Sequence, residues 1–254
     1  MLQAESVLVT GSNRGIGLEI VRQLVGKIHR IFATCRDPEG PRAQELRSLA
    51  AKHQGVEIIP LDINDPSSIE KAAAKVTELL QGAGLNLLIN NAGIVKPSSL
   101  ESETAENMAE VYKTNVIGPM LVSQAFLPLL RKASQKSPQK GMGCSKAAIV
   151  NLSSEGGSIT NILGWSIGHV MNYRCSKAAL NMLSRCQGLG FAEDGILCIA
   201  LHPGWVQTDM GNMPGQLAPM TVDASVRAIL DTLGRLTEKD SGTFVNWEGV
   251  VVPW

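Results

Sequence analysis

TGSNRGIG, at residues 10–17, follows the apolar run SVLVT (6–10) and opens the amphipathic stretch GIGLEIVRQLVG (15–26). The apolar run predicts a buried strand, and apolar residues every four positions after it predict a helix. Three glycines allow a tight turn between the two, namely Gly11, Gly15 and Gly17. Free N–H groups and the dipole at the start of a helix favour an anion, so this turn predicts a pyrophosphate site. The spacing GxxxGxG is a weak signal by itself, and a glycine-rich turn without a ligand is the alternative.

Short β-branched runs and longer helical stretches alternate along the rest of the chain. Further strands are predicted at 30–35, 56–61, 85–90, 146–154, 196–203 and 242–247. Helices are predicted near 41–53, 67–80, 101–132, 173–192 and 222–236. Near-continuous apolar strands between amphipathic helices indicate a parallel sheet that is covered on both faces. We therefore expect a single α/β domain over 1–254, a doubly wound Rossmann-type sheet of about seven strands.

Composition limits the kinds of partner that the protein binds. The 254 residues carry 23 basic and 23 acidic side chains, and no basic run interleaves with aromatic residues. Nucleic acid and an anionic membrane surface are therefore unfavourable partners. Apolar runs such as 195–201 are much shorter than the roughly 18 residues of a membrane span.

The cysteines and the start of the chain indicate the compartment. Five cysteines form no CxxC pair, as expected of a reduced protein. The first strand begins by Glu5 or Ser6, which leaves no room for a targeting peptide. We expect a cytoplasmic protein, and the sequence predicts no metal site.

The end of the second strand, ATCRD (33–37), predicts the choice of dinucleotide. In dinucleotide folds an acidic residue at this point accepts a hydrogen bond from the ribose 2′-OH. Here Cys35 occupies that position and Arg36 follows it, while Arg14 lies in the glycine loop. Two guanidinium groups suit a 2′-phosphate, so we expect NADP(H). A small error in register would instead make Asp37 the acceptor from the 2′-OH.

The stretch YRCSK (173–177) places Tyr173 four residues before Lys177. On a helix this spacing puts both side chains on one face, about one turn apart. A cation near a phenol lowers the pKa of the phenol and makes it a usable proton donor. The other tyrosine, Tyr112, has no lysine four residues after it.

Six motifs occur in an order that is similar to that of one large family: TGSNRGIG (10–17), NNAG (90–93), NVIG (115–118), NLSS (151–154), YRCSK (173–177) and HPGWVQTDM (202–210). Together they resemble the short-chain dehydrogenase/reductase family across essentially the whole chain. Within that family the chain looks most like the sniffer and C-factor group of carbonyl reductases. The ending VNWEGVVVPW (245–254) supports this narrower resemblance.

The resemblance implies four catalytic residues. Tyr173 would protonate the carbonyl oxygen as hydride reaches the carbon, and Lys177 would hold the nicotinamide ribose and lower the pKa of the phenol. Ser154 matches the serine that orients the substrate oxygen. Asn115 matches the asparagine that supports a lysine-bound water and a proton relay.

The resemblance also implies a set of cofactor contacts, for each of which an ordinary turn or capping role is the alternative. They are Gly11, Ser12, Asn13, Arg14, Gly15, Ile16, Gly17, Arg36, Asp62, Ile63, Asn91, Ala92, Gly93, Tyr173, Lys177, Pro203, Gly204, Val206 and Thr208.

Two segments are candidates for the substrate site. Ser154 precedes Tyr173 by 19 residues, more than is commonest in the family, and the extra length lies in the loop 155–172. Its larger side chains either form an apolar wall of the pocket or pin the loop to the core: Trp165, Ile167, His169, Val170 and Met171. The Gly/Pro-rich segment 211–220 suits a lid that closes on a ligand, or a simple turn of the chain.

These features predict an NADPH-dependent reductase of aldehydes, ketones or quinones, acting on a small carbonyl substrate without nucleic acid or membrane. An NAD-linked alcohol or hydroxysteroid dehydrogenase shares the catalytic residues and is the first alternative. A catalytically silent dinucleotide-binding regulator is the second. The helices near 101–132 and 173–192 are the family's usual dimer faces, so we expect a homodimer.

Overall fold

The computed structural model describes residues 2–165, 168–212 and 217–254. Seven parallel strands form one sheet in the order β3-β2-β1-β4-β5-β6-β7. The strands are β1 (Ser6–Thr10), β2 (Arg30–Cys35), β3 (Val56–Pro60), β4 (Leu87–Asn90), β5 (Ala148–Leu152), β6 (Leu197–His202) and β7 (Phe244–Asn246).

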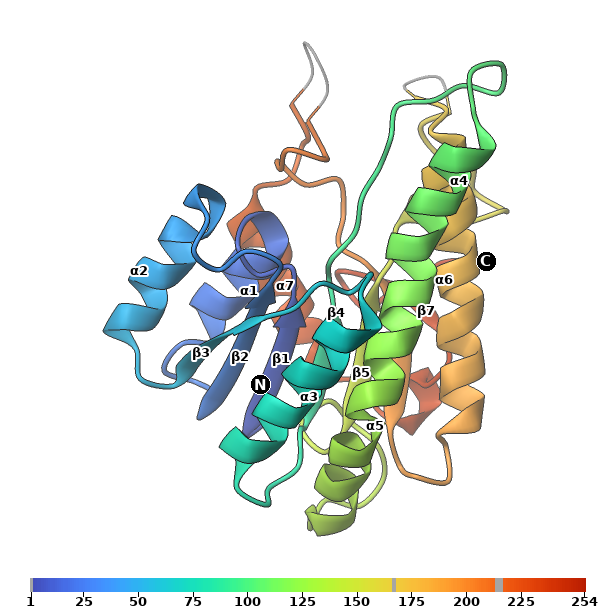
Figure 1. The fold of residues 1–254 in the computed structure, drawn as a ribbon. Helices are drawn as coiled ribbons and strands as arrows, with labels where there is room; N and C mark the ends of the chain where they lie inside the picture. The colour runs from blue at the N-terminus through green and yellow to red at the C-terminus, as the bar shows by residue number, and fades with distance from the viewer. Residues whose placement is uncertain (1, 166–167, 213–216) are drawn as a thin grey trace.

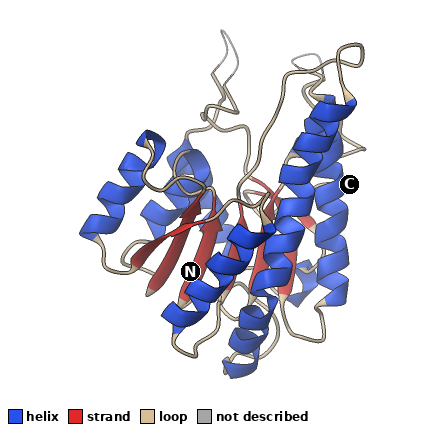
Figure 2. Ribbon diagram, in the orientation of Figure 1, coloured by secondary structure: helices blue, strands red, loops and turns tan. Residues whose placement is uncertain are grey.

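Helices connect these strands and cover the sheet (Figure 1). They are α1 (Gly15–Leu24), α2 (Gln44–Lys52), α3 (Pro66–Leu80), α4 (Ala105–Tyr112), α5 (Gly118–Lys136), α6 (Met171–Gly190) and α7 (Val222–Leu233). Short 3-10 turns lie at Pro41–Ala43, Glu155–Gly157 and Glu238–Asp240, and a π-helical turn at Lys113–Ile117 joins α4 to α5. Figure 2 shows the strands enclosed between the two groups of helices.

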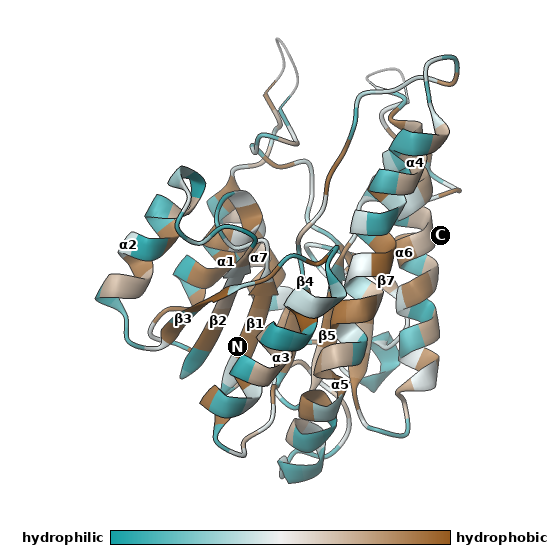
Figure 3. Ribbon diagram, viewed as in Figure 1, coloured by the Kyte–Doolittle hydropathy of each residue, from teal (hydrophilic) through white to brown (hydrophobic). Residues whose placement is uncertain are grey.

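The alternation of side chains along each strand divides the core into two layers. Val7 and Val9 of β1 pack in one layer, with the apolar faces of α1, α2 and α7. Leu8, between them in the sequence, packs in the other layer with α3 and α5. Successive strand residues point to opposite faces, so both faces of β1 are apolar and buried. Figure 3 shows the consequence, in that the strands are mostly hydrophobic whereas the helices carry hydrophilic residues on their outer faces.

The carboxyl ends of the strands meet at one edge of the sheet, and the long loops lie there. The segments between these strands and the next helices follow β4, β5 and β6, and their described residues, 91–104, 153–165, 168–170, 203–212 and 217–221, lie at this edge in Figure 1. The direction of chain progression reverses between β1 and β4, which pair directly. Open α/β sheets bind ligands in the crevice at such a point.

The predicted fold class is confirmed, with seven parallel strands and helices on both faces. The predicted region 101–132 resolves into α4, the π-helical turn and α5, which extends to Lys136. In the described part of the chain, no helix combines the length and the apolar character that crossing a bilayer requires.

Candidate active site

The glycine loop after β1 is shaped by backbone contacts. Gly11 and Gly15 have left-handed φ angles of 66° and 55°, which a side chain would strain. A Cβ on Gly17 would overlap the carbonyl oxygen of Gly11 and lie 2.5 Å from Asn91 Nδ2. The loop therefore lies tightly against the segment after β4, and its N–H groups lead directly into α1.

Two residues that are predicted to contact the cofactor, Ser12 and Asn91, fix the backbone of this loop through hydrogen bonds. Ser12 is buried, and its hydroxyl donates to Val9 O at 2.7 Å while accepting from Thr34 N at 3.2 Å. The amide of Asn91 donates to Thr10 O at 2.8 Å and to Gly11 O at 3.1 Å. No side chain caps the first turn of α1, so its N–H groups stay available for an anion.

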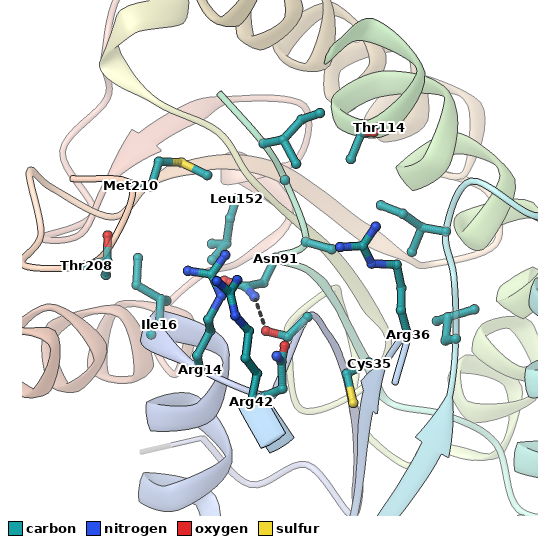
Figure 4. A pocket seen from close by; sticks show the side chains of 18 of the residues that line it. Arg14, Ile16, Cys35, Arg36, Arg42, Asn91, Thr114, Leu152, Thr208 and Met210 are labelled. Atoms are coloured by element: carbon teal, nitrogen blue, oxygen red, sulfur yellow. Dashed lines mark hydrogen bonds between the residues drawn. The ribbon is translucent and has the colours of Figure 1, made fainter. Parts of the chain in front are cut away.

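A cavity of about 630 Å³ runs along the carboxyl edge from the glycine loop to α6 (Figure 4). Most of the predicted site residues line it: Gly11, Asn13, Arg14, Gly15, Ile16, Arg36, Asp62, Ile63, Asn91, Ala92, Gly93, Tyr173, Lys177, Pro203 and Thr208. Six others do not line it and lie around it instead: Ser12, Gly17, Asn115, Ser154, Gly204 and Val206. A volume of this size accommodates a dinucleotide-sized ligand.

Tyr173 and Lys177 lie at the α6 end of this cavity. The ammonium nitrogen of Lys177 is 5.4 Å from the centre of the Tyr173 ring and donates to Leu152 O at 2.7 Å. Burial lowers the pKa of Lys177 to about 8. The spacing in the sequence thus brings the two side chains together on one face of α6, as predicted.

The pKa of the Tyr173 phenol is raised in the structure, whereas the sequence predicts that it is lowered. Burial raises the pKa of Tyr173, and a hydrogen bond with the Ser154 hydroxyl only partly opposes that rise. The sequence predicts a lowering by Lys177, whereas the loss of hydration on burial dominates and the pKa of Tyr173 is raised. A phenol with a raised pKa is fully protonated at neutral pH.

Ser154 lies beside the phenol at the end of β5. Its backbone is extended, and its hydroxyl accepts from Gly156 N at 3.0 Å, which caps the 3-10 turn Glu155–Gly157. A Cβ on Gly156 would lie 3.3 Å from Ser154 Oγ and 3.9 Å from Tyr173 Cε1. The turn is therefore in contact with both candidate catalytic side chains.

Asn115 is fully buried in the π-helical turn and connects three segments. Its Oδ1 accepts from Ile94 N, and its Nδ2 donates to Ile94 O and to Ser176 Oγ, each at 2.9 Å. Both amide donors are thus occupied by protein groups. The side chain positions the loop after β4 against α6, while its expected part in a water relay stays a prediction.

The adenosine end of the cavity contains three arginines rather than the two expected. Arg42, on the 3-10 turn Pro41–Ala43, was missed by sequence reasoning because it follows the second strand by several residues. In Figure 4 Arg14 and Arg42 project into the same part of the cavity, with Arg36 across from them. Arg14 also pairs with Asp209, its Nη1 2.5 Å from Asp209 Oδ2. Asp37 Oδ1 accepts from Gly40 N at 2.9 Å and so holds the turn that presents Arg42.

The loop 155–172 is pinned by Arg174. Its guanidinium donates to the carbonyl oxygens of Leu163, Gly168 and His169 and lies 5.7 Å from the ring centre of Trp165. Trp165 itself stacks on His169 at 4.5 Å. Among the described residues of this loop, none of the predicted wall residues lines the cavity. Ile167 lies outside the described residues, and the wall stays a prediction.

Backbone hydrogen bonds join the two ends of the segment that follows β6. Gln207 N donates to Met220 O at 2.9 Å and Met220 N to Trp205 O at 3.1 Å. Gly204 has a φ of 90°, and a Cβ there would lie 2.9 Å from Met220 Sδ. Met210, another residue that sequence reasoning missed, lines the cavity from this segment. Residues 213–216 of the predicted lid 211–220 lie outside the described residues.

Residues 5–216 match the family model described as short chain dehydrogenase. The chain belongs to this family and is an oxidoreductase.

Among solved structures, it is similar to the NADPH-bound carbonyl reductase from chicken fatty liver, with 56% identity, a TM-score of 0.97 and coverage of 100% of this chain and 96% of that one. Similarity to the carbonyl reductase Sniffer of D. melanogaster is 36% identity with a TM-score of 0.93, over 99% of this chain and 100% of that one. Short-chain dehydrogenase srdF of Neurospora crassa is 32% identical over 260 residues, which are 98% of this chain and 97% of that protein.

Proposed function

We propose that the protein is an NADPH-dependent carbonyl reductase that acts on an aldehyde, ketone or quinone. The observation that carries this proposal is one continuous cavity with three guanidinium groups at one end and Tyr173 with Lys177 at the other. The NADPH-bound chicken carbonyl reductase, at 56% identity, supports the same cofactor and reaction. The class of carbonyl substrate and a cytoplasmic location are also part of the proposal.

The residues present fit NADPH. Gly11, Gly15 and Gly17 carry no side chain, which would let a pyrophosphate approach the loop backbone, and the start of α1, where Arg14 makes no side-chain cap, presents N–H donors. Arg14, Arg36 and Arg42 suit a 2′-phosphate, which accepts charge-assisted hydrogen bonds from guanidinium groups. NADPH, when bound, supplies hydride to the carbonyl carbon.

The protein's own side chains then handle the oxygen and its proton. Tyr173 is the proton donor, and the raised pKa of Tyr173 keeps its hydroxyl proton in place until negative charge develops on the substrate oxygen. Ser154, beside it, donates a hydrogen bond to the same oxygen. Lys177 is charged below a pH of about 8, and its field stabilises the phenolate that remains after proton transfer.

The cavity wall near Lys177 favours an apolar substrate. Leu152, whose carbonyl oxygen accepts from Lys177, lines the cavity there, as does Ile94, which follows Gly93 beside Lys177. Met210 lines the cavity from the segment after β6. Of the charged side chains nearby, Lys96 pairs with Glu110, whereas Arg174 donates to loop carbonyl groups and its Nη1 has no partner among the described residues. We also propose that the chain is a single domain in which the loops 155–172 and 211–220 select the substrate.

The alternative, an NAD-linked alcohol or hydroxysteroid dehydrogenase, uses the same catalytic residues. The human 17-beta-hydroxysteroid dehydrogenase type 2 is 30% identical over 239 residues, 94% of this chain and 55% of that protein. The three arginines favour NADPH over NADH, because a 2′-phosphate accepts charge-assisted hydrogen bonds from guanidinium groups and an unphosphorylated ribose does not. A silent regulator is disfavoured by the complete set of Ser154, Tyr173 and Lys177.

Fluorescence titration with NADPH and with NADH tests the cofactor assignment. We expect NADPH to bind at least about tenfold more tightly, and Arg36→Asp and Arg42→Asp each to remove most of that preference. Arg131→Asp is the matched control, because Arg131 pairs with Asp194 and does not line the cavity. Tighter binding of NADH by the wild-type protein would overturn the assignment in favour of the dehydrogenase.

A further inference from the structure

The segment after β7 folds back along the edge of the sheet. Asn246 N donates to Val250 O at 2.9 Å and Val252 N to Phe244 O at 2.8 Å, so residues 250–252 run antiparallel beside β7. The side chain of Val252 is buried against Phe244, and the ring of Trp254 stacks on Phe244 at 5.9 Å. The backbone of residues 250–254 is therefore held firmly by the sheet.

The end of this segment is bonded to the loop that follows Ser154. Ser158 Oγ donates to Pro253 O at 2.7 Å. Thr160 donates to Trp254 O twice, through its N–H at 2.9 Å and its hydroxyl at 2.7 Å. These bonds join residues more than 90 positions apart, and Ser158 is 2% exposed. We call these four residues the tail clamp.

Hydrogen bonds continue from the tail clamp to the catalytic serine. Ser158 Oγ accepts from Asn161 N at 3.1 Å, and Asn161 Nδ2 donates to Glu155 Oε1 at 3.0 Å. Within the turn, Ser158 N donates to Glu155 O and Gly157 N to Ser154 O, both at 2.9 Å. Hydrogen bonds within the segment 154–161 therefore connect Ser154 to the tail clamp.

The same turn is pressed against α6 at the catalytic lysine. A Cβ on Gly157 would lie 2.6 Å from the carbonyl carbon of Lys177 and 2.8 Å from Ala178 N. The turn therefore has α6 on one side and the tail clamp on the other. A shift of the loop away from the tail changes where Ser154 lies relative to Tyr173.

The backbone just beyond the tail clamp is strained. Ile162 has a φ of 43° and Val170 a φ of 37°, a left-handed conformation that β-branched residues rarely adopt. Such conformations persist only where surrounding contacts enforce them. Thr160, two residues before Ile162, is fixed by its two hydrogen bonds to Trp254, which lies outside the loop.

The geometry points to Ser158 and Thr160 as positioning residues for carbonyl reduction, which act by fixing the loop after Ser154 to the folded-back tail. This inference rests on the proposed function for its effect on catalysis. It adds that the tail, which does not line the cavity, sets the shape of the carbonyl-binding end of the site. Cofactor binding at the arginine end does not depend on it.

The test compares wild type with the double variant Ser158→Ala/Thr160→Val. Thr160→Ser retains the hydroxyl and is the conservative variant, and Thr77→Val is the matched control, since the Thr77 hydroxyl bonds only within α3. Two quantities are measured for each full-length protein: kinetics with a carbonyl substrate and NADPH, and hydrogen exchange of the amides at 158–161.

We expect the double variant to raise KM for the carbonyl substrate by about tenfold, with a smaller change in kcat and NADPH affinity within about twofold. Exchange at 158–161 rises by at least about tenfold, whereas Thr160→Ser and Thr77→Val resemble wild type. Unchanged exchange and KM in the double variant would overturn the inference. So would a parallel loss of NADPH affinity, which indicates general destabilisation.

The experiment distinguishes a failure of the proposed function from a failure of the tail-clamp inference. If wild type consumes no NADPH with any carbonyl, the reductase proposal fails and the kinetic part falls with it. Hydrogen exchange still decides the tail clamp in that case: faster exchange in the double variant supports the clamp, and unchanged exchange refutes it.

Discussion

At the residue scale, burial shifts the pKa values of the two side chains at the α6 end of the cavity, Tyr173 upward and Lys177 downward. A spacing of four positions from Tyr173 to Lys177 places both on one face of α6, as the structure has them. The direction of the pKa of Tyr173 was not predictable in this way. It depends on how much water the fold removes from the phenol, and burial is the largest cause of the shift.

Lys177 gives a prediction for the pH dependence of stability. Its pKa falls from an ordinary value of 10.5 to about 8 through burial. Below pH 8 the lysine is charged in both states, and only the folded state bears the cost of burying that charge. Between pH 8 and 10.5 the folded state releases the proton before the unfolded state does, so the contribution of Lys177 to stability rises with pH.

Urea unfolding at pH 7.5 and 9.5 checks this, with wild type and Lys177→Met compared at each pH. The free energy of unfolding of wild type relative to the variant should increase by on the order of 1–2 kcal/mol between the two pH values. A constant difference, or one that shrinks at pH 9.5, would show that the lysine is not buried in its charged form.

At the element scale, strands and long helices were predictable because their apolar periodicity is strong, whereas short connecting elements were not. The π-helical turn at Lys113–Ile117 is stabilised by bonds from Asn115 to Ile94 and Ser176, which are distant in sequence. Arg42 reaches the cavity only because a turn held by Asp37 and Gly40 folds back. Neither contact produces a periodic pattern in the sequence from which it could be predicted.

The ion pair between Arg14 and Asp209 joins the glycine loop to the segment after β6. Both side chains are exposed, at 48% and 75%, so the pair itself contributes little to stability. Asp209 nevertheless competes with a cofactor phosphate for Arg14. Asp209→Asn should therefore tighten NADPH binding by about two- to fivefold, with a smaller effect at high salt.

Fluorescence titration at low and high ionic strength measures this effect, and Asp231→Asn on the exposed face of α7 is the control. Weaker NADPH binding in Asp209→Asn would mean that the carboxylate orients Arg14 for the cofactor instead of competing for it.

At the scale of the whole molecule, near-continuous apolar strands predict the doubly wound sheet because only strands buried on both faces have that composition. The folded-back tail was not predictable. Its sequence, 245–254, served only as a mark of resemblance, and its position depends on acceptors at Pro253 and Trp254 that any residue type supplies.

The expected homodimer stays a prediction. Met182 and Leu189 on α6 are 63% and 65% exposed, as a face that awaits a second copy would be. Sedimentation velocity should give a mass of two chains, and a clean monomer would contradict the expectation.

The most direct test of carbonyl reduction by this site is a single-turnover reaction of the protein–NADPH complex with an aldehyde, a ketone and a quinone. We predict that wild type oxidises NADPH with at least one of them, and that Tyr173→Phe slows this step by about 10²–10⁴-fold while binding NADPH within about twofold of wild type. Equal rates in wild type and Tyr173→Phe, or no oxidation of NADPH by any carbonyl in wild type, would contradict the account.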